Sequence, residues 1–190
     1  MKKIEIVFIV VIMVISGALC SCGAPAGTQN RETSDFARAE TAEERKVSQR
    51  LIQLTHEHRS KLGLPKLASD TYLKSLAMEH SLYVAKNHRG VGDIRSIAHA
   101  GVHQRSEVLR LRKGQALGEN VAWHDGYANS VGDQLFKTLM NSESHRKAIE
   151  QKNWEKMGIS VSKGGNTFYA TQLFTRPYIK PAPIPHMIFL

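Results

Sequence analysis

Cysteine is almost absent from this chain. Its 190 residues include two cysteines, Cys20 and Cys22, and no thiol follows them. From residue 23 onward the chain therefore cannot form a disulfide, a thiolate zinc site or a cysteine nucleophile. A folded region without these supports must rely on its hydrophobic core, and the remaining length is sufficient for one. We expect a single globular domain, since the sequence also shows no internal repeat.

Long hydrophobic stretches are also lacking, with one exception near the N-terminus. Residues 6–15 form an almost unbroken apolar run behind a basic start, which is shorter than a membrane-spanning helix and typical of a secretory signal. The stretch Leu19-Cys20-Ser21-Cys22 follows, and it resembles the lipobox of bacterial lipoproteins. We predict that residues 1–21 are a lipoprotein signal peptide and that Cys22 carries the lipid. Lipidation at Cys20, an ordinary signal peptide and an uncleaved anchor are the alternatives.

Acidic residues are outnumbered by basic ones. Lys and Arg total 26 against 17 Asp and Glu, which gives a net charge of +9. A basic surface favours anionic neighbours such as phospholipid headgroups or acidic wall polymers, although much of such charge is often only solvated surface. Nucleic acid would be another anionic partner, but no nucleic-acid-binding module is recognisable and an exported lipoprotein rarely meets DNA. We therefore expect no nucleic-acid partner.

Composition divides the chain into four segments. Behind the signal, residues 22–40 are rich in small and polar residues and predict a flexible tether. Residues 177–190 are rich in proline, which is excluded from the interior of a sheet, and predict an irregular tail. All of the amphipathic pattern lies between these two segments. We therefore place the domain at residues 41–176.

The first half of the domain predicts helices. Thr41 and Glu44 form a capping box for a helix that ends before Gly63. The apolar positions of this helix recur at helical spacing: Val47, Leu51, Leu54, His58 and Leu62. A second helix begins at residue 69 or 70 and carries His80 on its apolar stripe.

The second half combines shorter helices with strands. Helices are predicted at residues 102–112, which hold a basic cluster, and after Ser130. Residues 119–123 predict a short strand or extended loop. Residues 156–175 alternate apolar and polar side chains around a glycine-rich turn at 164–166, which predicts a β-hairpin. Helices followed by an antiparallel hairpin indicate an α+β layered domain.

Five short motifs occur in order along this domain. They are Leu62-Gly63-Leu64-Pro65-x-Leu67, Leu76-Ala77-x-x-His80-Ser81, Gly118-Glu119-Asn120, Met140-Asn141-Ser142-x-x-His145-Arg146, and the closing pair Met157-Gly158-Ile159 with Thr171-Gln172-Leu173-Phe174. From about Val47 to Phe174 the chain thus resembles the bacterial branch of the CAP superfamily, the cysteine-rich secretory, antigen 5 and pathogenesis-related proteins with SCP-like domains. The resemblance implies a three-layer α-β-α sandwich with a short antiparallel sheet. The lack of disulfides departs from the eukaryotic relatives and agrees with the bacterial branch.

The resemblance also implies a central cleft. In many CAP proteins two histidines and two glutamates line this cleft, and in some the histidines bind a divalent metal such as zinc. His99, Glu119 and His145 match three of these four positions. The second glutamate has no match, because Asn141-Ser142 stands where relatives with the full set carry it.

These residue types can hold a metal ion or pass a proton. Zinc accepts imidazole nitrogen and carboxylate oxygen, and an open zinc site needs three protein ligands plus water. Glu119 is accordingly a metal ligand, a proton acceptor for bound water and thus the candidate catalytic residue, or a group that orients one histidine. The structural alternative is that Glu119 ties the sheet edge to a neighbouring helix through backbone amides.

Four further residues are expected to support the site. Ser142 lies near the start of the helix that carries the second histidine. We expect Asn120 to serve in a turn and Arg146 in an ion pair. His80 is expected to be a buried, hydrogen-bonded histidine, and a role as a partner to a site residue is the alternative.

Two classes of function follow from these observations. The first, which we favour, is a lipid-anchored binding module of the bacterial cell envelope, with a lipid, a wall polymer or another protein as its ligand and no catalytic activity. The second is a metal-assisted hydrolase that uses His99, His145 and Glu119. The incomplete acidic pair favours binding, since a hydrolase needs a clear general base beside its metal. We expect a monomer that holds at most a weakly bound divalent metal and no other cofactor.

Overall fold

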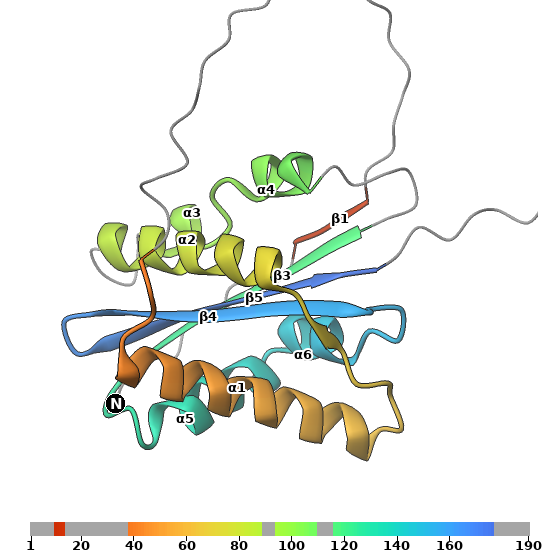
Figure 1. The fold of residues 1–190 in the computed structure, drawn as a ribbon, viewed down its shortest axis with the longest axis horizontal. Helices are drawn as coiled ribbons and strands as arrows, with labels where there is room; N and C mark the ends of the chain where they lie inside the picture. The colour runs from red at the N-terminus through yellow and green to blue at the C-terminus, as the bar shows by residue number, and fades with distance from the viewer. Residues whose placement is uncertain (1–9, 14–37, 89–93, 110–115, 177–190) are drawn as a thin grey trace, which may run out of the picture.

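A five-stranded sheet lies between two layers of helices (Figure 1). The computed structural model describes residues 10–13, 38–88, 94–109 and 116–176. The strands follow the order β1-β3-β5-β4-β2, with these bounds: β1 Val10–Met13, β2 Ala68–Ser69, β3 Ala116–Asp125, β4 Lys156–Gly164 and β5 Thr167–Thr175. The predicted three-layer α+β fold is confirmed.

Helices cover both faces of the sheet (Figure 1). One layer contains α2 (Thr71–Asn87), α3 (Ile94–Ile97) and α4 (Val102–Val108). The other layer contains α1 (Ala42–Lys61), α5 (Val131–Asn141) and α6 (Glu143–Glu150). Helix α1 begins with the predicted capping box of Thr41 and Glu44. Helix α4 ends at Val108, earlier than the predicted limit at residue 112, and residues 110–115 lie outside the described ranges.

The β4–β5 hairpin forms the middle of the sheet. Its strands pair antiparallel along their whole length and leave Gly165 and Asn166 as a two-residue turn. Gly165 has a φ of 62°, a left-handed conformation that glycine adopts without steric cost, so the predicted tight turn is confirmed. The sheet is mixed rather than purely antiparallel, because β2 pairs in parallel with β4. A two-residue strand carries too little periodicity to be recognised from sequence.

Strand β3 turns alternate side chains toward the two helical layers, as the period of two in a strand requires. Leu117 belongs to the same apolar cluster as Val102 of α4. Ala122 belongs instead to the cluster that contains residues of α1 and α5. Glu119 has the parity of Leu117, and Asn120 has the parity of Ala122. These two neighbouring motif residues therefore face opposite layers.

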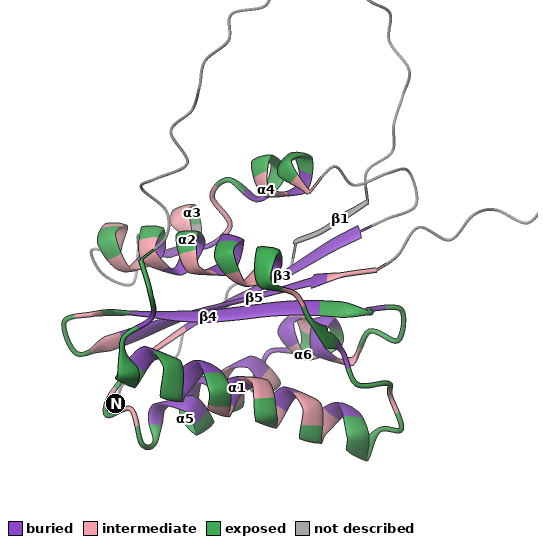
Figure 2. Cartoon of the chain, in the orientation of Figure 1, coloured by how far each residue is buried: buried purple, intermediate pink, exposed green. Residues whose placement is uncertain are grey.

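The buried residues concentrate in the sheet and on the inward faces of the helices (Figure 2). The largest apolar cluster joins β4 and β5 to α1 and α5, and it includes the fully buried side chains Leu51, Leu135, Phe168 and Phe174. Each side chain of this kind contributes roughly 1.5–3 kcal/mol when it is removed from water. This core accounts for a domain that folds without disulfides.

A buried arginine joins α1 to α6. Arg59 is fully buried, and its Nη1 donates to the carbonyl oxygens of Ile149 at 2.8 Å and Gln151 at 2.9 Å. Its Nε donates to the carbonyl oxygen of Pro65 at 3.1 Å. Carbonyl groups at the end of a helix carry partial negative charge, so the end of α6 compensates the guanidinium.

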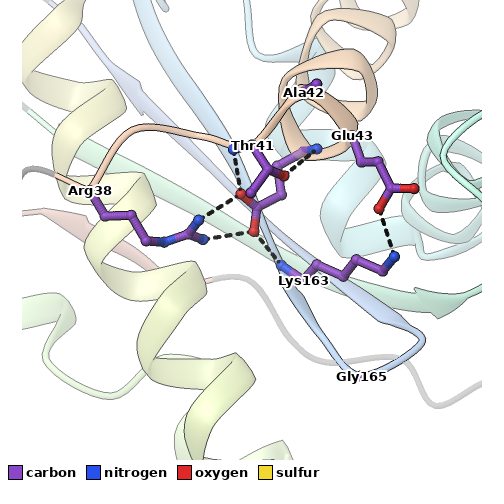
Figure 3. Close-up of a pocket in the computed structure, with 7 residues that line it drawn as sticks. Arg38, Thr41, Ala42, Glu43, Lys163 and Gly165 are labelled. Carbon is purple, nitrogen blue, oxygen red and sulfur yellow. Dashed lines mark hydrogen bonds and ion pairs between the residues drawn. The ribbon is translucent and has the colours of Figure 1, made fainter.

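The carboxylate of Glu44 fastens the residues before α1 to the hairpin. It accepts hydrogen bonds from Nη1 and Nη2 of Arg38 at 2.9 and 2.7 Å. It also accepts hydrogen bonds from the backbone amides of Thr41 and Lys163, both at 2.8 Å. Figure 3 shows Arg38, Thr41 and Lys163 converging at the start of α1. Glu44 is 1% exposed, whereas the side chain of Arg38 is 39% exposed, so solvent screens this ion pair in part.

A second buried carboxylate extends this attachment. Glu40 is the last residue of the predicted tether, and it is 6% exposed. It accepts hydrogen bonds from three elements: Ser48 Oγ of α1 at 2.7 Å, Ser160 Oγ of β4 at 3.0 Å and Lys74 Nζ of α2 at 2.7 Å. The folded unit therefore includes residues from at least Arg38 onward, inside the segment predicted as tether.

A short N-terminal strand lies at one edge of the sheet. Residues 10–13 of β1 pair antiparallel with residues 116–119 of β3. They belong to the apolar run interpreted as a secretory signal. Cys22, most of the predicted signal and tether, and the tail at 177–190 lie outside the described residues, so lipidation stays a prediction. Within the described ranges, no helix has the length and apolar character needed to cross a membrane.

Candidate functional site

His99 and Glu119 meet beside the first half of β3. His99 lies in the turn between α3 and α4, and its Nδ1 is 2.9 Å from Oε1 of the fully buried Glu119. A carboxylate only accepts hydrogen bonds, so Nδ1 carries a hydrogen, and in the neutral form of the ring the lone pair lies on Nε2. This Nε2 is buried and has no hydrogen-bond partner among the described residues. Glu119 thus presents a nitrogen lone pair of His99 to the cleft.

The second oxygen of Glu119 is held by Arg105 of α4. Oε2 lies 2.8 Å from Nε and 2.5 Å from Nη2 of the guanidinium. The remaining nitrogen, Nη1, donates to the carbonyl oxygen of Ala100 at 2.8 Å. The side chains of Arg105 and Glu119 are 11% and 0% exposed, so solvent screens their attraction little. Both carboxylate oxygens are therefore occupied by protein donors.

These contacts decide the charge of Glu119. Burial alone would raise the pKa of its carboxyl group, but the hydrogen bond from His99 and nearby positive charge, including that of Arg105, outweigh burial and leave the pKa lowered. The group is thus ionised near neutral pH. A proton acceptor for water needs a pKa close to the working pH, and Glu119 lacks it.

His80 approaches the same carboxylate from α2. Its Nε2 lies 2.6 Å from the carbonyl oxygen of Ala98 and 3.9 Å from Oε1 of Glu119. Since a carbonyl oxygen only accepts, Nε2 of His80 carries a hydrogen. Burial lowers the pKa of His80 to about 4, so the ring is neutral near neutral pH. His80 is the expected buried, hydrogen-bonded histidine, and it holds the backbone directly before His99.

His145, the second predicted histidine, lies in the first turn of α6. Ser142, one of two serines expected to start this helix, is its N-cap, and its Oγ lies 3.4 Å from the backbone nitrogen of His145. His145 is 2% exposed, yet neither ring nitrogen has a hydrogen-bond partner within the described part of the chain. Burial lowers the pKa of His145 to about 4, and the charge of His99 adds to this effect.

A buried chain of amides holds the backbone of His145. Asn120 Nδ2 donates to the carbonyl oxygen of His145 at 3.2 Å and to Gln172 Oε1 at 3.1 Å. Gln172 Nε2 in turn donates to Thr55 Oγ1 of α1 at 3.2 Å. These contacts connect α6 to the core through β3 and β5. The side of β3 opposite Glu119 therefore positions the second histidine.

Two expectations about supporting residues are wrong. Asn120 lies within β3 rather than in a turn, because its strand pairing with β5 continues beyond it to Asp125. Arg146 forms no ion pair among the described residues, and its Nη1 donates to the carbonyl oxygen of Met140 at 2.9 Å. This bond satisfies a carbonyl group near the end of α5. Arg146 thus stabilises the corner between α5 and α6.

Gly118 is required by a neighbouring tryptophan. A Cβ at position 118 would lie 2.6 Å from Cζ2 of Trp154. The buried Trp154 donates from Nε1 to the carbonyl oxygen of Ala148 in α6, at 2.7 Å. The indole therefore sets the distance between β3 and α6. Any side chain at position 118 would separate the elements that carry Glu119 and His145.

The described residues do not form the three-ligand metal set, and two histidines remain as candidate ligands. In the ranges that the structure covers, no three His, Cys, Asp or Glu side chains converge as a metal-binding group. Glu119 orients His99, as a carboxylate does for a ligating histidine. The donors that remain are Nε2 of His99 and the ring nitrogens of His145. Two imidazoles suit a divalent transition metal whose other positions hold water.

Arg105 is the site residue that the sequence interpretation missed. The sequence shows Arg105 only as part of a basic cluster, because no motif connects it to Glu119, 14 residues away. One physical signal pointed to such a partner. A carboxylate predicted to lie in a folded cleft requires a compensating positive charge. The basic cluster at residues 102–112 is a possible source of that charge.

Residues 52–175 match the family described as the cysteine-rich secretory protein family, CAP. The chain belongs to the CAP family. Membership agrees with the α-β-α layers and with the Gly118-Glu119-Asn120 motif on β3. No curated protein matches this CAP chain in sequence.

Solved structures with the same fold include three bacterial proteins. An extracellular protein containing an SCP domain from Bacillus anthracis is 25% identical, with a TM-score of 0.55 over 74% of this chain and 45% of its own. A cysteine-rich secretory protein from Staphylococcus aureus is 19% identical, with a TM-score of 0.54 over 74% and 42%. An outer surface protein from Borrelia burgdorferi is 21% identical, with a TM-score of 0.50 over 75% and 99%. This chain thus spans less than half the length of the first two.

Proposed function

We propose that this chain is an exported CAP binding domain held at the cell envelope. Its cleft uses His99 and His145 as a weak, reversible site for a divalent transition metal, with zinc as the expected ion. Glu119 takes no part as a ligand and orients His99. The metal supplies a Lewis-acidic centre to which a ligand can be coordinated.

One observation carries this proposal. Nε2 of His99 and both ring nitrogens of His145 are buried without a hydrogen-bond partner among the described residues. A buried polar group without a partner costs roughly 1–3 kcal/mol, so these nitrogens favour a group that they can receive. In the neutral ring of His99, the hydrogen bond to Glu119 places the hydrogen on Nδ1 and the lone pair on Nε2, and the lowered pKa of His145 keeps the second ring neutral. Both states are those that ligate a metal.

Binding is favoured over hydrolysis by the state of Glu119. A metal-assisted hydrolase requires a carboxylate or histidine that can accept a proton from water. Both oxygens of Glu119 are engaged by His99 and Arg105, and the pKa of this group is lowered. A hydrolase built on His99, His145 and Glu119 therefore lacks its base.

A hollow beside the cleft offers room for a ligand. It has a volume of about 420 Å³ and opens between α2 and α4. His80 and Arg105 lie along it together with the apolar side chains of Leu76, Tyr83 and Val108. A lipid, a wall polymer or a protein segment at the envelope could meet this mixed apolar and polar surface. The hollow supports a binding role beside the metal site.

Attachment to the envelope is proposed through a lipid on Cys22. The motif Leu19-Cys20-Ser21-Cys22 motivates it, and the extracellular and outer-surface descriptions of two structural relatives agree with export. The intact mass of the membrane-extracted protein should show a diacylated or triacylated N-terminus at Cys22. A soluble mature chain that begins elsewhere with a free amine would contradict the lipid anchor.

The metal site is tested by calorimetric titration of zinc into the purified chain. We expect wild type to bind zinc reversibly, and His99→Ala and His145→Ala each to abolish binding while the protein stays folded. His103→Ala is the matched control, because His103 lies exposed on α4, close to His99 in sequence. Equal zinc affinity in wild type and His145→Ala, or unfolding of wild type by a chelator, would contradict the proposal.

A further inference from the structure

We infer that Arg105 acts as a built-in cation on Glu119 and thereby limits which metal ions the cleft can bind. This inference rests on the proposed metal site at His99 and His145. It assigns Arg105 as a positioning and specificity residue, because the guanidinium touches Glu119 and not the metal. The cleft then accepts metals through imidazole nitrogen alone.

The geometry leaves Arg105 no freedom to act as a mobile surface charge. All three guanidinium nitrogens are engaged, Nε and Nη2 with Oε2 of Glu119 and Nη1 with the carbonyl oxygen of Ala100. The side chain is 11% exposed, although arginine is rarely buried without a partner. A guanidinium stays protonated at every pH at which the domain is folded, so its charge on Glu119 is permanent.

Arg105 occupies the carboxylate that a metal ion could otherwise bind. Calcium and magnesium are bound through oxygen ligands, and a carboxylate supplies most of the charge that attracts them. The carboxylate that contacts His99 is already neutralised by Arg105. Zinc, copper and nickel accept imidazole nitrogen and remain able to bind.

The contact between Arg105 and Glu119 also makes His99 a weaker electron donor to a metal. A carboxylate that accepts a hydrogen bond from a ligating imidazole makes that ring a better electron donor. Arg105 withdraws charge from Glu119, so Glu119 supports His99 less than a free carboxylate would. Removing the charge of Arg105 should therefore strengthen metal binding. A residue with only a structural role would produce the opposite sign, because its loss would disturb the cleft.

The sign of the affinity change is the test. Zinc is titrated calorimetrically into wild type, Arg105→Gln and Arg105→Lys. Arg105→Gln keeps a hydrogen-bond donor but removes the charge, and we expect zinc to bind at least about tenfold more tightly, the lower end of the effect of groups one contact away from a metal. Arg105→Lys keeps the charge and should retain the wild-type affinity. Unchanged or weaker zinc binding by Arg105→Gln would overturn the inference.

A double-mutant cycle shows whether Arg105 acts through Glu119. In a Glu119→Gln background, adding Arg105→Gln should leave zinc affinity unchanged, because the carboxylate that transmits the effect is gone. Arg50→Gln is the control for loss of an arginine ion pair elsewhere, since Arg50 pairs with Asp133 at an exposed site between α1 and α5. A tenfold gain that persists in the Glu119→Gln background would overturn the assignment to Glu119.

Wild type provides a test that does not depend on the folding of any variant. The melting temperature should rise with added zinc and stay constant with millimolar calcium or magnesium; a rise with either would overturn the inference. The two proposals also fail separately. If Arg105→Gln binds zinc and wild type does not, the role of Arg105 is supported and the proposed metal function is contradicted. If wild type binds zinc through His145 and Arg105→Gln has the same affinity, the proposed metal function is supported and the role of Arg105 is contradicted.

Discussion

Replacing Glu44 by Gln removes the charge that fastens the segment before α1 to the β4–β5 hairpin. The wild-type carboxylate accepts two hydrogen bonds from Arg38 and one each from the backbone amides of Thr41 and Lys163. A glutamine side chain keeps the shape but offers one acceptor oxygen and no charge. We expect a loss of stability whose size depends on pH.

The size of this loss follows from the pKa of Glu44. Burial alone would raise that pKa, but the hydrogen bonds from Arg38, Thr41 and Lys163 lower it from 4.5 to about 2. Because the folded-state pKa lies below the unfolded-state value, the stabilisation is fully present above about pH 4.5 and is lost as pH falls through about 2. At about 1.4 kcal/mol per pKa unit, the carboxylate contributes about 3 kcal/mol to folding.

Urea unfolding of wild type and Glu44→Gln at about pH 7 and about pH 3 measures this contribution. The free energies of unfolding should differ by about 3 kcal/mol at neutral pH and by clearly less at acid pH. Glu43→Gln is the matched control, because Glu43 pairs with Lys163 Nζ while 56% exposed, and such pairs contribute about 0–1 kcal/mol. An equal gap between wild type and Glu44→Gln at both pH values would refute the assigned role.

Three further predictions concern packing, a buried charge and the cleft histidines. Gly158→Ala should lower the free energy of unfolding by about 1–3 kcal/mol or more, because a Cβ there would collide with the backbone of α2 at Leu73. Thermal melting measures this loss, and an unchanged melting temperature would contradict the close packing. Arg59→Met should cost roughly 1–3 kcal/mol by urea unfolding, because it leaves three carbonyl oxygens without their donor; zinc affinity should not change. The folded-state pKa of His145 lies near 4, below its ordinary value of 6.5, so the unfolded chain binds more protons between these values and stability should rise with pH across this range. His145→Asn should reduce that slope in a series of unfolding curves, and an unaltered slope would contradict the burial of a neutral ring.

Local signals in the sequence predicted the elements whose stability is local. The capping box of Thr41 and Glu44 and the turn at Gly165 each depend on residues close together in the chain, and both occur as expected. The resemblance to the CAP superfamily also predicted that His99, Glu119 and His145 line one cleft. The hydrogen bond between His99 and Glu119 agrees with part of that expectation, and the place of His145 beside them stays a prediction.

Features that depend on contacts between distant elements could not be predicted in this way. Glu40 lies in a polar, glycine-containing stretch that is typical of a tether, and its carboxylate accepts a hydrogen bond from each of α1, α2 and β4. Arg105 resembles any basic residue of α4 until the fold brings it to Glu119. Its presence changes the expected role of Glu119 from metal ligand to an orienting partner of His99.

The most direct test of the metal site is a nuclear magnetic resonance measurement of the imidazole nitrogens with and without zinc. Without metal, His99 should carry its hydrogen on Nδ1, because that nitrogen faces Glu119. Added zinc should shift Nε2 of His99 and one ring nitrogen of His145, while Nδ1 of His99 stays protonated and the exposed His103 is unaffected. Zinc that shifts other histidines and leaves His99 and His145 unchanged would contradict the proposed metal site.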